Sequence, residues 1–139
     1  MANSGRQVRL DRRYDWVGPP DTVSKIRHIK LRRVDGETEE EARYREQREE
    51  LNEWNSRFWA EHNTLFDAKK TEFIEKRTRE ISRLDTVSAA DMSAFYKEFL
   101  NTRRSALSAY NSEWYHRNLS LIWPALKVNM HRFRRVLRR

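Results

Sequence analysis

Histidine and carboxylate side chains are the groups in this sequence that could bind a metal ion or move a proton. The chain has four histidines, and the one close acid–histidine pair at helical spacing is Glu113 with His116. A carboxylate di-iron bundle needs two Glu-x-x-His units and two further glutamates. His62 and His116 remain candidate ligands for haem or a metal, if two helices bring them together. The alternative is that each is a hydrogen-bonded histidine at the edge of a core.

Other kinds of catalytic site are poorly supported by this composition. The chain has three glycines and no cysteine, which excludes Gly-rich phosphate loops, paired-glycine nucleophile elbows, disulfides and thiolate metal sites. Carboxylates are frequent between Glu37 and Glu53, but they alternate with arginines at helical spacing, as on a solvated helix face. We therefore expect no enzyme activity, no catalytic residue, no metal and no cofactor, with haem as the one alternative.

Positive charge is concentrated at the two ends of the chain. The net charge is +8; residues 1–36 contribute +5, residues 37–66 contribute −5, and residues 119–139 contain six cations and no acid. Such an excess predicts an anionic partner. The cations of the C-terminal segment are candidate membrane or anion contacts: Lys127, Arg132, Arg134, Arg135, Arg138 and Arg139.

The basic C-terminal segment has two interpretations that the sequence leaves open. Apolar residues interleaved with arginines are typical of a helix that lies in a membrane interface. Alternatively, the helix packs its apolar stripe against the core and exposes a cationic face. An alternative function is a basic helical module that binds RNA or associates with the ribosome, but the aromatic residues that would stack on bases fall mostly on helical core stripes. No DNA partner is expected.

Hydrophobic periodicity predicts three to four helices. Thr38 with Glu41, and Ser88 with Asp91, have the spacing of capping boxes. Apolar steps of three and four residues predict a first helix as far as Leu65, a second helix capped by Asp67 and a long third helix from Ser88. A fourth runs from Leu119 to Leu137, and Pro124 should kink it or mark its start.

The sequence predicts that the N-terminal region is extended chain. Tyr14 to Asp21, YDWVGPPD, predicts an ordered loop whose aromatic residues pack on the helical body or face a partner. Ile26 to Val34 suits one extended segment with no convincing second strand.

We predict an all-α fold, a small antiparallel assembly of three to four helices with an extended N-terminal segment. Residues 1–13 form a basic tail faintly like a targeting segment, 14–36 the aromatic Pro-Gly loop segment and 37–139 the helical domain.

Four motifs in this order point to a family. They are YDWVGPPD at Tyr14 to Asp21; Glu53, Trp54 and Asn55 with Phe58 and Trp59; the run Phe95 to Leu100; and Trp114, Tyr115, Arg117 and Asn118. Together they closely resemble the mitochondrial cytochrome c oxidase assembly factor eight family, also called the apoptogenic protein one family. The likeness spans Tyr14 to about Met130. The amino terminus is shorter than a full import signal, and 75–88 is compressed relative to vertebrate members.

The resemblance implies a non-enzymatic mitochondrial protein that supports assembly and maintenance of cytochrome c oxidase. It implies peripheral attachment to the matrix face of the inner membrane and contacts with oxidase subunits or intermediates. The family's second name records a proposed role in apoptosis. Residues that would face an oxidase partner are Tyr14, Asp15, Trp16, Gly18, Pro19, Pro20, Trp54, Trp59, Trp114 and Tyr115. The cationic C-terminal helix suits the anionic lipids of that membrane.

Overall fold

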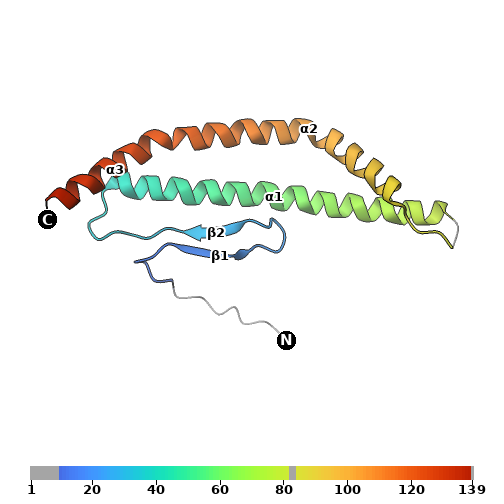
Figure 1. Cartoon of the computed structure of the whole chain (residues 1–139), viewed down its shortest axis with the longest axis horizontal. Coiled ribbons are helices and arrows are strands. Elements are labelled where there is room, and N and C mark those ends of the chain that lie inside the picture. The colour runs from blue at the N-terminus through green and yellow to red at the C-terminus, as the bar shows by residue number, and fades with distance from the viewer. Residues whose placement is uncertain (1–9, 82–83, 139) are drawn as a thin grey trace.

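The computed structural model describes residues 10–81 and 84–138, which form a helical hairpin with a small sheet against it (Figure 1). Helix α1 spans Glu39–Glu80, α2 spans Ala89–Ser120 and α3 spans Ile122–Leu137. Helices α2 and α3 return along one side of α1, and strands β1 (Trp16–Pro20) and β2 (Arg27–Lys30) lie along the other side (Figure 1). The fold is mostly helical as predicted, but the all-α assignment is wrong in detail because the sheet is present.

Helix α1 begins at the predicted capping box and continues past the predicted break. The backbone N–H of Glu41 donates to Thr38 Oγ1 (3.2 Å), and the backbone N–H of Thr38 donates to Glu41 Oε2 (2.9 Å). Asp67 does not start a second helix; it lies within α1. No glycine or proline interrupts residues 37–123, and Phe66 and Phe73 on either side of Asp67 both lie against Phe95 of α2. Continuous packing on one partner helix therefore outweighs the local cap signal.

Helices α2 and α3 are separated by a single residue. The predicted capping box starts α2, with the Asp91 backbone N–H donating to Ser88 Oγ (3.1 Å). The predicted fourth helix begins at Ile122 rather than at Leu119, which belongs to α2. Pro124 lies in the first turn of α3, where a missing N–H is tolerated because no intrahelical bond is needed there. Of the two roles predicted for Pro124, it marks the start of the helix.

Aromatic rings form the contact between α1 and α2. Tyr110 of α2 is buried, and its ring stacks on Phe58 (centroids 4.0 Å apart) and on Trp54 (5.1 Å) of α1. Further along, Phe66 lies between Phe95 and Phe99 of α2, at 5.8 and 5.2 Å. The core is therefore a narrow ladder of rings, as the aromatic-rich sequence predicted.

The N-terminal segment contains a strand that the sequence analysis did not predict. Strand β1 covers most of the predicted loop, and it pairs antiparallel with β2 in the register Trp16↔Lys30, Val17↔Ile29 and Pro20↔Arg27. A two-stranded sheet has free edges, so Pro19 and Pro20 need not donate a ladder hydrogen bond there. This freedom is why a Pro-rich segment can pair.

Polar side chains of α1 bind the backbone of the β-hairpin. Asn52 accepts the N–H of Ile29 at Oδ1 (3.1 Å) and donates from Nδ2 to the carbonyl of Arg27 (2.9 Å). Glu49 accepts the N–H of Leu31 (2.9 Å), and the hydroxyls of Ser24 and Ser56 are buried together (2.9 Å apart). These α1 side chains complete the hydrogen bonding of β2 as another strand would, which fixes the hairpin without a large apolar contact.

Candidate functional site

Helix α3 turns a charged face toward the first turn of α1. Glu40 contacts His131 (2.6 Å) and Lys127 (3.6 Å) of α3. Glu41 has a side chain that is 2% exposed, and it contacts Arg135 (2.8 Å) and Arg132 (3.9 Å). Three of the predicted anion-binding cations therefore already have carboxylate partners inside the chain.

Glu41 is held in its charged form by this arrangement. Burial alone would raise its pKa, but hydrogen bonds from Arg135 and from the backbone N–H of Thr38 outweigh burial, so that the pKa lies below its ordinary value. For Glu40, the hydrogen bond with His131 is the largest cause of a lowered pKa. The acidic first turn of α1 is thus both a helix cap and the binding partner of α3.

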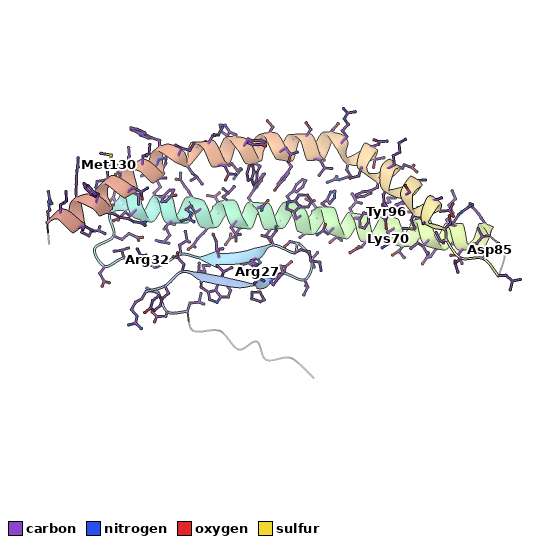
Figure 2. All side chains as sticks on the ribbon, viewed as in Figure 1. Arg27, Arg32, Lys70, Asp85, Tyr96 and Met130 are labelled. Carbon is purple, nitrogen blue, oxygen red and sulfur yellow. The ribbon has the colours of Figure 1, made fainter. Side chains whose placement is uncertain are left out.

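The apolar face of α3 points away from α1. Trp123 is 65% exposed and Phe133 is 64% exposed, whereas Val128 on the opposite side is 1% exposed. Figure 2 shows Met130 on the side of α3 that faces away from α1. This face of α3, together with Leu119 at the end of α2, is called the outer face, and each member is at least half exposed: Leu119, Ile122, Trp123, Leu126, Met130, Phe133, Val136 and Leu137. The interpretation of α3 as a core-packed helix with a cationic exterior is therefore wrong.

Two more of the predicted cations make no ion pair with the part of the chain that the structure describes. Within the described residues, Arg134 and Arg138 have no carboxylate partner. Both line a cavity of about 440 Å³, together with Thr38, His131 and Arg135. Arg139, the last predicted anion contact, lies outside the described residues. Arg134 and Arg138 thus supply positive charge beside the outer face.

The predicted aromatic partner residues fall into two groups. Trp54 and Trp59 are half-buried in the α1–α2 contact, where Trp59 Nε1 donates to the hydroxyl of Tyr110 (3.0 Å). Trp114 and Tyr115 are more open, and Tyr115 is 62% exposed. Tyr115 precedes Leu119 by one helical turn, so it extends the outer face. The structure does not bring all four together in one patch.

The predicted residues of the N-terminal motif lie in and beside β1. Tyr14, Pro19 and Pro20 are exposed. Asp15 accepts the backbone N–H of Arg32 (2.8 Å). The indole of Trp16 lies over Gly18, so closely that a Cβ built there would be 2.6 Å from Trp16 Cη2. Gly18 therefore provides the space in which the Trp16 ring rests.

The two candidate histidine ligands are not brought together. His62 of α1 is buried beside Phe58, Trp59 and Phe99. His116 is exposed on α2, 17 residues beyond Phe99, or about 25 Å along the helix. Burial and then the positive charge of Arg103 lower the pKa of His62 below its ordinary value of 6.5, which favours the neutral ring. These positions give no support to a haem site shared by both.

The buried His62 makes stability depend on pH. We expect the free energy of unfolding to fall as pH drops below about 6.5, because the unfolded chain then binds a proton at this position that the folded chain does not. Chemical denaturation of the wild type and of His62→Gln between neutral and mildly acidic pH measures the effect. The variant should lose part of the slope, and His116→Gln is the exposed control. Equal slopes for His62→Gln and the wild type would contradict this assignment.

The part of the chain that the structure describes has neither a metal-binding cluster nor a membrane-spanning helix. It contains no group of three or more His, Asp or Glu side chains arranged to hold a metal ion. None of its helices is both long and apolar enough to cross a bilayer.

The acidic residues that bind α3 were missed as functional positions. Glu40 and Glu41 were interpreted only as first-turn acids, and Asn52 and Ser56 were given no role. One signal was available: residues 37–66 carry −5 and residues 119–139 carry +6, so the two segments are complementary. Pairing them would have predicted that the basic face of the C-terminal helix points inward.

The fold and the outer face define a helical hairpin protein that exposes an apolar helix surface flanked by arginines. The family model for cytochrome c oxidase assembly factor 8 matches residues 14–134, and the chain belongs to this family. A mitochondrial member of the family in Caenorhabditis briggsae is 63% identical over 139 residues, covering all of this chain and 98% of the relative. No solved structure matches the chain.

More distant relatives carry the family name itself. Cytochrome c oxidase assembly factor 8 of Bos taurus is 37% identical over 135 residues, which cover 91% of this chain and 70% of the relative. The Homo sapiens protein of the same name is 35% identical over 127 residues, which cover 86% of this chain and 62% of the relative. The family-model match, residues 14–134, spans the four motifs on which the predicted resemblance rests, and the predicted family is confirmed.

Proposed function

We propose that this protein is a non-enzymatic mitochondrial factor that supports assembly and maintenance of cytochrome c oxidase from the matrix face of the inner membrane. The observation that carries the proposal is membership of a family whose mammalian relatives are named for oxidase assembly. The architecture supports it, because an assembly factor needs surfaces that bind a partner, and large apolar and aromatic side chains of this protein are exposed.

The outer face of α3 supports attachment to a lipid surface. An interfacial helix needs one apolar face free to enter the headgroup region and cationic residues close to it. The outer face supplies eight large apolar side chains, including Trp123 and Phe133, and Arg134 and Arg138 supply the charge. Contacts with Glu40 and Glu41 hold the opposite side of the helix on α1, so binding would require no unfolding of α3.

We place the surface that would bind an oxidase subunit on the β-hairpin, away from the outer face. Exposed Tyr14, Pro19 and Pro20 belong to the β-hairpin, which lies on the side of α1 opposite α2. Rigid aromatic and proline side chains lose little conformational entropy when they bind. With α3 on the membrane, the hairpin would remain available to a protein partner.

Depletion and rescue in cells tests the proposed function. Loss of the protein should lower the level and activity of cytochrome c oxidase, and the wild-type chain should restore both. Protease protection of mitochondria and mitoplasts should place the protein on the matrix side, and alkaline carbonate should release it from membranes. Unchanged oxidase in cells shown to lack the protein would contradict the proposal. Cell-death assays on the same cells check the predicted link to apoptosis.

Arg134 of α3 and Arg138, the residue that caps the C-terminal end of this helix, should contribute to lipid binding. We expect Arg134→Ser and Arg138→Ser each to weaken binding to anionic vesicles by about 1 kcal/mol, since each removes one cation near the surface. Flotation with vesicles of graded anionic lipid content measures the loss. Arg57→Ser with Arg104→Ser, two exposed arginines outside α3, is the matched control. Equal losses in the two pairs would show that total charge alone matters.

A further inference from the structure

A second cavity is separate from the one that Arg134 and Arg138 line. It lies between the segments that flank the β-hairpin, the first half of α1, and α3. Its volume is about 380 Å³, which falls within the range of small-molecule sites. Five arginines and three carboxylates (Asp15, Glu37 and Glu41) line it, so cations outnumber acids in its wall. We call this the arginine pocket; its arginines are Arg13, Arg32, Arg45, Arg48 and Arg132.

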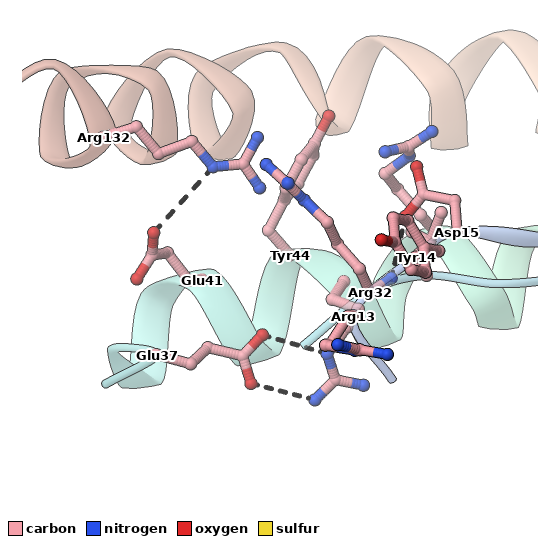
Figure 3. Close-up of a pocket in the computed structure, with 11 residues that line it drawn as sticks. Arg13, Tyr14, Asp15, Arg32, Glu37, Glu41, Tyr44 and Arg132 are labelled. Atoms are coloured by element: carbon pink, nitrogen blue, oxygen red, sulfur yellow. Dashed lines mark hydrogen bonds and ion pairs between the residues drawn. The ribbon is translucent and has the colours of Figure 1, made fainter. Parts of the chain in front are cut away.

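Three of these arginines are already engaged. Arg45 is buried and donates to both carboxylate oxygens of Glu37 (3.0 and 3.2 Å). Arg13 binds Asp11, just outside the pocket (2.6 Å). Arg132 approaches Glu41 from α3 (3.9 Å), as Figure 3 shows. These pairs neutralise much of the wall and hold the three segments in place around the space.

Arg32 and Arg48 are left without an acidic partner among the described residues. Asp15, which also lines the pocket, accepts the backbone N–H of Arg32 at Oδ1 (2.8 Å), and no salt bridge joins it to the Arg32 guanidinium. Arg48 lies over the ring of Tyr44, with its guanidinium carbon 5.7 Å from the ring centroid. Both guanidinium groups therefore keep their donors free at the rim of the same cavity.

We propose that the arginine pocket binds the phosphate group of a small soluble molecule, with Arg32 and Arg48 as its main ligands. A guanidinium presents paired N–H donors that match phosphate oxygens, and Arg32 and Arg48 supply two such groups that have no salt-bridge partner among the described residues. Tyr14 and Tyr44 also line the space and add hydroxyl groups. This site goes beyond the proposed assembly function and does not depend on it.

The position of the pocket favours a soluble phosphate over a lipid headgroup. Arg132 reaches the pocket from the side of α3 that faces α1, whereas the outer face points the other way. A membrane in contact with the outer face would therefore lie on the opposite side of α3 from the pocket. Soluble and lipid-bound phosphate can be separated by experiment because they should respond to different substitutions.

Calorimetric titration of the full chain with pyrophosphate tests the proposal. We expect saturable binding to one site, and a loss of affinity of at least about tenfold in Arg32→Gln with Arg48→Gln, because each change removes charge-assisted hydrogen bonds. Arg57→Gln with Arg104→Gln is the matched control and should bind as the wild type does. Absence of saturation at millimolar pyrophosphate, or equal affinity in both double variants, would overturn the proposal.

A second experiment measures flotation of the same variants with vesicles that contain phosphatidic acid. The Arg32→Gln, Arg48→Gln variant should float with these vesicles as the wild type does, because lipid binding is assigned to α3. If the variant loses vesicle binding but still binds pyrophosphate normally, the pocket serves a headgroup and the soluble-ligand proposal is wrong. Circular dichroism of each variant checks that its helices are intact; both arginines are exposed, so folding should be preserved.

Discussion

Replacing Tyr110 by alanine is expected to lower the free energy of unfolding by about 3 to 5 kcal/mol, the usual cost of deleting a buried aromatic side chain. Tyr110 is 9% exposed, stacks on Trp54 and Phe58, and joins its hydroxyl to Trp59 and Asn55. A thin core has few other contacts to replace it. Urea unfolding followed by circular dichroism measures the loss.

Two further variants separate the contributions of the ring and the hydroxyl. Tyr110→Phe keeps the stacking and leaves Trp59 Nε1 and Asn55 without their partner, so it should cost about 1 to 3 kcal/mol. Tyr115→Ala on the exposed side of α2 should change stability by about 0.5 kcal/mol or less. If Tyr110→Ala were no more destabilising than Tyr115→Ala, the ring ladder would not be what joins α1 to α2.

Removing the largest side chains of the outer face is expected to abolish lipid binding without unfolding the protein. Burial of one large apolar side chain is worth about 1.5 to 3 kcal/mol. The triple variant Trp123→Ser, Met130→Ser, Phe133→Ser should therefore lower partitioning into anionic vesicles by at least about a hundredfold. Flotation or tryptophan-independent light scattering measures the partition.

The control for this variant removes exposed apolar side chains outside α3. Val17, Leu84 and Leu100 are 58%, 95% and 55% exposed, so Val17→Ser, Leu84→Ser, Leu100→Ser removes comparable exposed surface. This control should bind vesicles nearly as the wild type does. In the outer-face variant, the contacts of Glu40 and Glu41 with α3 are untouched, so its melting behaviour should stay close to that of the wild type.

Local signals correctly predicted the starts of α1 and α2. Both capping boxes form in the structure, because a short side chain three residues ahead of an acid satisfies free N–H groups whatever the rest of the chain does. The same reasoning failed at Asp67. A single cap residue without a glycine or proline before it does not stop a helix whose next turns are also packed on α2.

Long-range features could not be predicted from local pattern. Pairing of Trp16–Pro20 with Arg27–Lys30 depends on Asn52 and Glu49 of α1, which bind the backbone of β2 and its flank. Periodicity showed that 122–137 is amphipathic, but it could not show which face is inside. That choice is made by Glu40 and Glu41, about 90 residues earlier in the chain, which bind the cationic side and leave Trp123 and Phe133 outside.

The same arrangement explains how a small core can support an exposed apolar surface. Apolar residues that would normally fill the core are placed on the outer face, and ion pairs hold α3 instead. A buried carboxylate such as Glu41 is tolerated because it accepts hydrogen bonds from Arg135 and Thr38. The apolar side chains of the outer face therefore add little to the core, but they are available to bind a partner or a lipid surface.

We propose above all that the outer face enters the lipid of a membrane. Measuring the depth of α3 in a bilayer tests this proposal most directly. The chain has no cysteine, so a spin label can be attached at Met130→Cys on the outer face or at Arg57→Cys on α1 without a competing thiol. On vesicle-bound protein, the label at position 130 should be accessible to oxygen and shielded from an aqueous nickel complex, whereas the label at position 57 should remain in water. If both labels are equally accessible to the nickel complex while the protein is bound, the outer face does not enter the lipid.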